Sequence, residues 1–192
     1  MVPLKALVLA DAAPFVPLEQ LLREHPIDVV LTLGDLKRSH LEPLAAFTGP
    51  KLGVHGNHDD GDEFDDLGIE DLHLRVVELG GRLIGGFAGS HRYRPGGRYM
   101  WSQEEAAAAL EGFPAVDVLI AHSPPLGVND EAGDVAHVGL EALRDYVERA
   151  RPRVLLHGHT YPVIQRRRLG DTIVRHVRGH ALLGLPGPRV TA

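Results

Sequence analysis

The sequence predicts an α/β fold, on three observations. Short continuous apolar runs at residues 4–10 and 29–33 have the pattern of strands buried on both faces. A helical pattern at residues 17–23 lies between them, as in a β-α-β unit. Gly80-Gly81 joins two strand-like segments, which is a hairpin signal. Part of the sheet system is therefore expected to be antiparallel.

The remaining elements follow the same alternation along the chain. Strand patterns cover residues 4–10, 29–33, 52–54, 75–79, 82–87, 116–121, 154–156, 163–165, 172–177 and 181–183. Helical patterns cover residues 17–23, 41–47, 104–110 and 138–149. Ser102 and Glu105 form a capping box before the third helix. The last three strands are expected to close a second sheet, and Arg166-Arg167-Arg168 to be a solvated turn, with a phosphate contact as the alternative.

Length and composition set further limits. The 192 residues suit a single domain, residues 1–192, and fractions of 44% hydrophobic and 24% charged residues are ordinary for a globular protein. The absence of cysteine excludes disulfides and thiolate metal sites. The net charge of −6 argues against duplex nucleic acid as a partner. Without a basic leader or an apolar run of about 20 residues, we expect a cytoplasmic protein with no membrane partner. The sequence does not indicate an oligomeric state.

Five of the predicted strands end in polar side chains. These are Asp11, Asp35, the segment Asn57-His58-Asp59, His122 and His159. Ligands bind beyond the carboxyl ends of strands in α/β sheets, so these groups are expected to meet at one crevice. Taken singly, each has an ordinary structural explanation, such as a helix cap for Asp11. Five strand ends of the same kind together favour a functional site.

In order and approximate spacing, these groups resemble the motif blocks of the calcineurin-like metallophosphoesterases over nearly the whole chain. The blocks here read Asp11, Gly34-Asp35, Gly56-Asn57-His58-Asp59, His122 and Gly158-His159. The four-residue G-N-H-D block is the most specific of them. Residues 85–90, 122–127 and 156–159 also resemble a bacterial branch of that superfamily. The resemblance implies a four-layer α/β/β/α sandwich with two mixed β-sheets and a metal site at the strand carboxyl ends.

The family resemblance also implies two metal ions, bridged by Asp35 and by a hydroxide that attacks phosphorus. One metal would be bound by four residues, all of which are present: Asp35, Asn57, His122 and His159. By the same resemblance, His58 would donate a proton to the leaving oxygen. Asp59 would hold the orientation of the His58 ring, since a neighbouring carboxylate fixes an imidazole's tautomer.

The sequence departs from the family pattern at the other metal. Its D-x-H and G-H-x-H blocks have Ala13 and Tyr161 where the family has histidine. Both losses affect the same ion, so we expect one tight divalent metal site, with Asp11 and Asp35 holding a second ion weakly or not at all. Four residues near the blocks are candidate replacement ligands: His91, His137, His157 and Tyr161.

Three side chains are candidates for substrate binding. His137 lies in the long loop after the His122 strand, and a structural or substrate-facing role is favoured for it over metal binding. Arg92 and Arg94 follow a glycine-rich loop, and an arginine fork suits a phosphate. A solvent-exposed charged loop is the more ordinary interpretation of these two arginines.

The leading functional hypothesis is a metal-dependent phosphoesterase acting by attack of a metal-bound hydroxide on a small phosphate ester or nucleotide. Diesters are favoured over monoesters, because a weakened second site loses cationic stabilisation of the more highly charged monoester. The alternative is a catalytically weak protein of the same fold that binds a metal, a nucleotide or a protein partner. Because the ligands are nitrogen and oxygen only, Mn, Fe, Zn and Ni all suit the site.

Overall fold

The computed structural model describes residues 3–188 and contains two large sheets. In spatial order, the first sheet consists of β13 (Gly179–Leu185), β1 (Leu4–Ala10), β2 (Val29–Thr32), β3 (Lys51–Gly53) and β4 (Glu70–Asp71). The second consists of β11 (Arg166–Leu169), β12 (Thr172–His176), β10 (Val154–His157), β9 (Val118–Ala121), β6 (Arg82–Phe87) and β5 (Val76–Leu79). Each sheet combines parallel and antiparallel pairs, so the prediction of two mixed sheets is confirmed.

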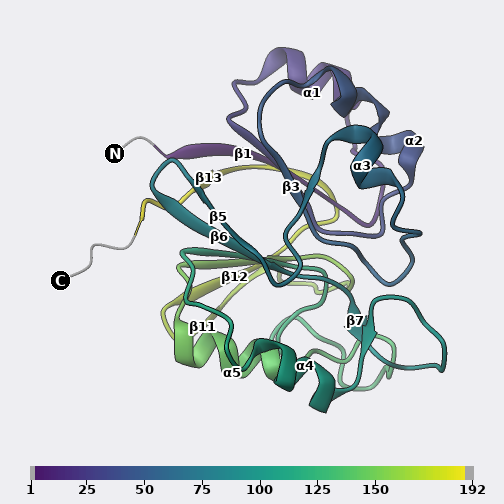
Figure 1. Cartoon of the computed structure of the whole chain (residues 1–192), viewed down its shortest axis with the longest axis vertical. Helices are drawn as coiled ribbons and strands as arrows, with labels where there is room; N and C mark the ends of the chain where they lie inside the picture. Colours follow the sequence, from purple (N-terminus) through teal and green to yellow (C-terminus); the bar gives the residue numbers. More distant parts are fainter. Residues whose placement is uncertain (1–2, 189–192) are drawn as a thin grey trace.

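Helices cover the outer face of each sheet (Figure 1). Those on the first sheet are α1 (Leu18–Glu24), α2 (Arg38–Leu41), the 3-10 helix η1 (Glu42–Ala46) and α3 (Glu63–Leu67). Those on the second sheet are α4 (Gln103–Leu110) and α5 (Glu141–Ala150). This arrangement is the four-layer α/β/β/α sandwich. None of the helices in residues 3–188 has the length and apolar character that crossing a membrane requires.

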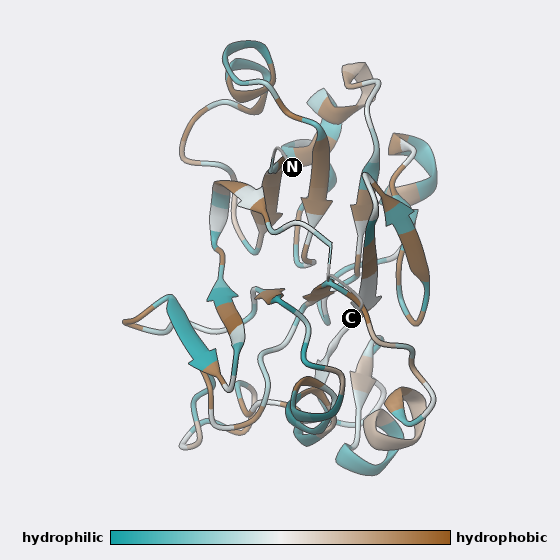
Figure 2. Ribbon diagram, turned by 90° about the vertical axis from the view of Figure 1, so that its left-hand side faces the viewer, coloured by the Kyte–Doolittle hydropathy of each residue, from teal (hydrophilic) through white to brown (hydrophobic). Residues whose placement is uncertain are grey.

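The layers are held together by side chains that alternate along each central strand. In β1, Ala6 and Val8 pack against the second sheet, whereas Leu7 and Leu9 pack against the helices above. Successive side chains of a strand point to opposite faces, so an uninterrupted apolar run buries both faces of the sheet. Figure 2 shows these hydrophobic strands in the middle of the molecule, between helices with hydrophilic segments.

Two predicted signals are confirmed residue by residue. Gly80-Gly81 connects β5 and β6 as an antiparallel hairpin. The Ser102 side chain accepts a hydrogen bond from the Glu105 backbone N–H, and the Glu105 carboxylate accepts one from Ser102 N–H, which is the capping box of α4.

Three predictions about the C-terminal third are wrong. Residues 181–183 were expected in the second sheet, but β13 pairs antiparallel with the whole of β1 in the first sheet. Residues 166–168 form strand β11 instead of a turn, and the predicted strand at 163–165 lies in the preceding bend. Charged residues are accepted in β11 because it is an edge strand, with β12 on one side only.

Several short elements differ from the sequence patterns. The helix expected at residues 41–47 is divided between α2 and η1, where Pro43 stands at the start of the 3-10 turn. Helix α3, strand β4 and the two-stranded sheet of β7 (Ser90–His91) and β8 (Met100–Trp101) had no clear pattern. Elements of two to five residues are too short for a periodic signal to be recognised.

Candidate metal centre

Tight backbone turns place the polar groups directly after the strands. Asp11, Asp35 and His159 all have positive φ angles, of 58°, 55° and 70°. This left-handed conformation is uncommon for residues other than glycine and is often found at functional sites. Before Asp35, Gly34 has a φ of 94°, and a Cβ atom on it would lie 2.3 Å from Gly56 N. The G-D and G-N-H-D blocks therefore touch through their glycines.

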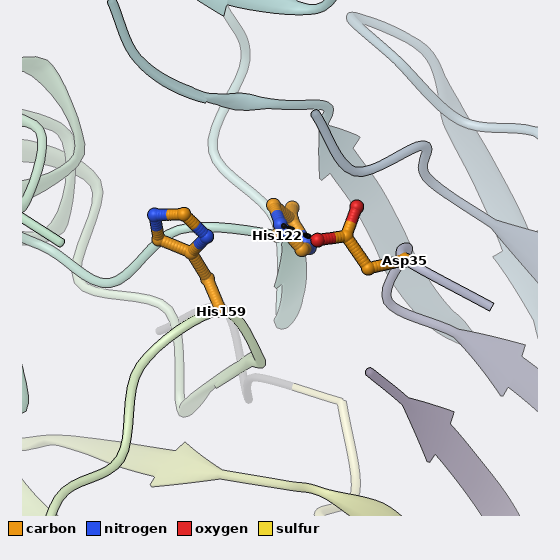
Figure 3. Close-up of side chains that lie close together, drawn as sticks. All are labelled: Asp35, His122 and His159. Carbon is orange, nitrogen blue, oxygen red and sulfur yellow. Dashed lines mark ion pairs between the residues drawn. The ribbon is translucent and has the colours of Figure 1, made fainter. Parts of the chain in front are cut away.

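His122 lies at the centre of the site and is fully buried (Figure 3). Its Nδ1 is 2.8 Å from Leu33 O and so carries a proton. Its Nε2 points at two oxygen atoms, Asn57 Oδ1 at 3.1 Å and Asp35 Oδ2 at 3.4 Å. A neutral imidazole would turn a lone pair towards both oxygens. Either a proton on Nε2 or a metal ion must therefore lie at this point, and in the second case the three atoms have the arrangement expected of ligands of one metal ion.

His159 completes the set. Ligand atoms of Asp35, His122 and His159 all lie within 4.8 Å of one another. His159 Nε2 is 2.8 Å from Ala136 O, which makes Nε2 the donor and leaves Nδ1 with the lone pair. The four residues predicted as ligands of one metal are thus brought together, and their nitrogen and oxygen atoms fit a divalent transition metal.

The charges of the centre are strongly coupled. Burial opposes a charge on His122, but the Asp35 carboxylate outweighs burial and raises the pKa of His122 to about 9. Burial likewise favours the neutral form of Asp35, but the charge and hydrogen bond of His122 lower the pKa of Asp35 well below its usual range. Burial and the charge on His122 lower the pKa of His159 to about 3. The metal-free centre therefore holds an imidazolium ion, a carboxylate and a neutral imidazole.

Metal binding near neutral pH is expected to release about one proton per chain, from His122. Because its pKa is raised from 6.5 to about 9, His122 Nε2 holds a proton below pH 9 and must lose it to bind a metal. Proton release should therefore fall to zero above about pH 9, and affinity should weaken as the pH falls below it. Calorimetric titration of the metal in buffers of different ionisation enthalpy measures the proton count. An enthalpy independent of the buffer at pH 7 contradicts this assignment.

Asp59 organises the backbone beneath the ligands. Its Oδ2 accepts hydrogen bonds from Gly56 N–H at 2.7 Å and Asp35 N–H at 2.9 Å, and its Oδ1 accepts one from Leu36 N–H at 3.1 Å. The carboxylate thus ties the turn that carries Asp35 to the turn that carries Asn57. Burial raises the pKa of Asp59, and the Gly56 hydrogen bond offsets part of this rise. Its predicted role in orienting the His58 ring stays a prediction.

A buried stack of aromatic rings that was not expected from the sequence lies beside Asp59. The His55 ring stacks between Phe64 and Tyr99, with ring centroids 3.9 Å and 4.8 Å away. His55 Nδ1 lies 3.3 Å from Glu63 Oε1 and 4.0 Å from Asp59 Oδ2. Helix α3 is thereby connected to the metal centre. The one sequence signal for this contribution of His55 is its position directly before the G-N-H-D block.

At the position of the family's second metal ion, the carboxylates of Asp11 and Asp35 are present but the two histidines are missing. Both Asp11 carboxylate oxygens accept the His159 N–H at 3.0 Å, and burial raises the pKa of Asp11 to about 6, although His122 acts against the rise. Ala13 is exposed, and Tyr161 lies at the rim with 61% of its surface exposed. Neither side chain offers an imidazole to an ion beside Asp11.

The site opens to solvent through two adjoining hollows. A cavity of about 260 Å³ is lined by three of the predicted ligands, Asp35, Asn57 and His159, whereas the buried His122 does not line it. Its lining also includes Asp11, Tyr93, His137 and Tyr161. A wider cleft of about 620 Å³ contains Arg94 and Arg98. His58 and Asn57 each line both hollows, and of the two only His58 is exposed. Tyr93 was not among the predicted site residues, but its hydroxyl lies 3.4 Å from Asn57 Nδ2.

Three other candidates, Arg92, His157 and His91, do not line the cavity at the metal centre. Arg92 lines neither hollow, and its guanidinium binds the Glu105 carboxylate at 2.6 Å. His157 is fully buried, and both of its ring nitrogens have partners, Asn129 Nδ2 and Gly158 O. Burial lowers the pKa of His157 to about 3. His91 does not line the cavity around Asp11 either.

His137 is the remaining candidate for a replacement ligand. It lines the metal cavity, and its ring lies 5.2 Å from that of His159. Its Nδ1 is 2.7 Å from Asp134 Oδ2, and with Glu131 these two residues form another group of closely spaced ligand atoms. His137 therefore lies at the site, and it is held there by its contact with Asp134 in the same loop.

The sequence agrees with the family that the fold and the site indicate. Residues 7–162 match the model of the calcineurin-like phosphoesterases. The chain belongs to this family. No curated protein matches the sequence significantly.

Solved structures show the same fold at low sequence identity. Protein TT1561 of Thermus thermophilus has a TM-score of 0.71 and 14% identity, over 96% of this chain and 95% of that one. Vacuolar Protein Sorting 29 from Cryptosporidium parvum has a TM-score of 0.50 and 16% identity, over 92% of this chain and 74% of that one. At these identities the likeness concerns the fold alone.

Proposed function

We propose that this protein is a phosphoesterase dependent on one tightly bound divalent metal ion, with Asp35, Asn57, His122 and His159 as ligands. The observation that carries the proposal is the orientation of His122, whose buried Nε2 points at Asn57 Oδ1 and Asp35 Oδ2. Membership of the calcineurin-like family supports hydrolysis of phosphate esters. Mn, Fe, Zn and Ni all suit the donor set.

The two hollows suggest how a substrate binds. The phosphate would occupy the smaller cavity beside the ligands, and the rest of the ester would lie in the wider cleft. A bound divalent cation neutralises phosphate oxygens and acidifies water. His58, which lines both hollows, would then give a proton to the leaving oxygen.

Arg94 and His137 are the proposed substrate contacts, one in each hollow. Arg94 offers a fork to a phosphate or to a second ester group, and His137 offers a ring nitrogen near His159. The substrate would be a small phosphate ester or a nucleotide, since a net charge of −6 disfavours duplex nucleic acid.

Diesters are the proposed class, with monoesters slower. A monoester carries one more negative charge near neutral pH, and a second cation is what neutralises it in a dinuclear site. Ala13 and Tyr161 leave Asp11 without the imidazole ligands that would hold that cation. The same loss supports a second candidate, a metal, nucleotide or partner-binding protein with little activity. An exposed His58 favours the enzyme, because a binding protein does not need a proton donor beside its metal.

Replacing His58 by alanine is expected to lower kcat for bis-p-nitrophenyl phosphate about 10²- to 10⁴-fold, because the leaving oxygen loses its proton donor. Metal content should not change, since His58 is not among the four ligands. The assay is hydrolysis of the diester and of p-nitrophenyl phosphate with each of the four metals, alongside metal analysis per chain.

His25→Ala is the matched control, an exposed histidine after α1, and it should retain full activity. Turnover that is equal in His58→Ala and wild type refutes the role of His58. A protein that binds one metal per chain but hydrolyses neither ester with any metal is a binding protein. Two tightly bound metals in the wild type contradict the mononuclear site.

A further inference from the structure

A second cavity, of about 530 Å³, shares no lining residue with the hollows at the metal centre. It is lined by residues at the start of β10, such as Val154, and at the end of β13, such as Leu185. Leu185 pairs with Leu4, the first residue of β1, whereas Asp11 follows the last residue of β1. The predicted metal ligands follow the carboxyl ends of the strands, and none of them lines this cavity. The cavity extends along β10 from Val154 to Leu156, which pairs with Arg175 of β12.

Five arginines line this cavity, here named the arginine cavity: Arg151, Arg153, Arg166, Arg168 and Arg175. The strand register explains why three of them lie on one face. Arg166 is directly opposite Arg175, and Arg168 is directly opposite Ile173, on the antiparallel pair of β11 and β12. Arg167 alternates with its neighbours and does not line the cavity. In Figure 2, β11 is the hydrophilic strand at the edge of the lower sheet.

These positive charges have little compensation. Within residues 3–188, none of the five forms an ion pair with a carboxylate, and the Arg175 Nε atom is buried without a hydrogen-bond partner. Arg168 and Arg153 donate only to backbone carbonyls. The single acidic residue in the lining is Asp171. Like charges directly opposite on neighbouring strands are destabilising, so the arrangement favours a bound anion.

Protection of a sheet edge does not account for the whole cluster. Charged side chains on an edge strand prevent pairing with other chains, and this explains arginines on β11. Arg175, however, is on β12, which has β11 on one side and β10 on the other. A charged group there faces the space between the sheets, where the neighbouring residue on its face, Ile173, packs against the apolar core.

The rest of the lining is apolar. Val154, Leu156, Ile173, Leu183 and Leu185 contribute to the same cavity. Its volume is within the range of small-molecule sites, roughly 300–1,000 Å³. We propose that the arginine cavity binds a small organic phosphate with an aromatic or apolar part, of the nucleotide class. Arg166 and Arg175 bind the phosphate, and the aliphatic side chains contact the base.

The test is calorimetric titration of the full-length, metal-loaded protein with α,β-methylene-ADP, a nucleotide with a non-hydrolysable link, and with inorganic phosphate and adenosine. The methylene nucleotide should bind more tightly than phosphate, and adenosine should not bind. Arg166→Gln with Arg175→Gln should weaken the nucleotide at least about 10-fold, because two charge-assisted hydrogen bonds are lost. Arg167→Gln, on the other face of the same strand, should leave the affinity unchanged.

Thermal unfolding separates a lost ligand site from a damaged fold. Without ligand, the Arg166→Gln and Arg175→Gln variant should melt at the wild-type temperature or about 1–3 °C above it, since two like charges are removed. Equal nucleotide affinity in this variant and the wild type overturns the proposal. Phosphate binding as tightly as the nucleotide refutes the apolar subsite. If no anion binds, the arginines are solvated side chains at a sheet edge and the proposed site is overturned.

Discussion

Replacing Asp59 by alanine is expected to lower the free energy of unfolding by about 2–4 kcal/mol and to weaken metal binding at least about 10-fold. The carboxylate is buried and accepts three backbone N–H groups, from Asp35, Leu36 and Gly56. Alanine leaves these donors without their acceptor at a largely buried position. The turns that carry Asp35 and Asn57 also lose their link, so the ligands separate.

Urea unfolding and metal titration measure the two effects. Asp59→Asn is the informative partner, because it keeps one carbonyl oxygen but turns an NH₂ group towards a backbone donor, so it should lose part of the stability. Asp60→Ala, at the exposed neighbouring position, should unfold like wild type. An Asp59→Ala protein as stable as Asp60→Ala would show that the three hydrogen bonds contribute little.

The central sheet architecture could be predicted because buried parallel strands have a strong local signal. The apolar run of β1 coincides with the observed strand, residues 4–10. Sheet membership is a different matter, since it depends on contacts between distant residues. The segment of β13 has a strand pattern, but nothing local indicates that it pairs with β1, from which residues 11–178 separate it along the chain. Three consecutive arginines likewise suggest a turn until their place at a sheet edge is known.

The metal ligands were predicted from motif blocks, and the structure brings those side chains together. Their supporting contacts were not predictable in the same way. Asp59 was expected to orient His58, whereas its observed hydrogen bonds go to backbone N–H groups. The His55 and Glu63 pair depends on helix α3, which the sequence pattern did not predict. Such contacts combine a turn, a short helix and a distant loop, so no periodicity or spacing records them.

Restoring two imidazoles is expected to restore a second metal ion. In the double variant Ala13→His with Tyr161→His, Asp11 and Asp35 would share an ion with the two new side chains. Asp11 and Tyr161 line the same cavity as Asp35, so the carboxylates are already in place. Both replaced residues are exposed, so the variant should fold. We expect two metal ions per chain, against one in the wild type, and roughly 10-fold or greater gain in monoester hydrolysis.

Metal analysis after gel filtration, with kinetics on both p-nitrophenyl esters, tests this prediction. Ala13→His with Tyr161→Phe is the matched control, because it removes the same hydroxyl group without supplying the second imidazole, and it should bind one ion. A larger gain for the monoester than for the diester would tie the proposed diester preference to the missing cation, since the monoester carries the extra charge that this cation neutralises. A double variant that folds but still binds one ion would contradict the idea that Ala13 and Tyr161 alone make the centre mononuclear.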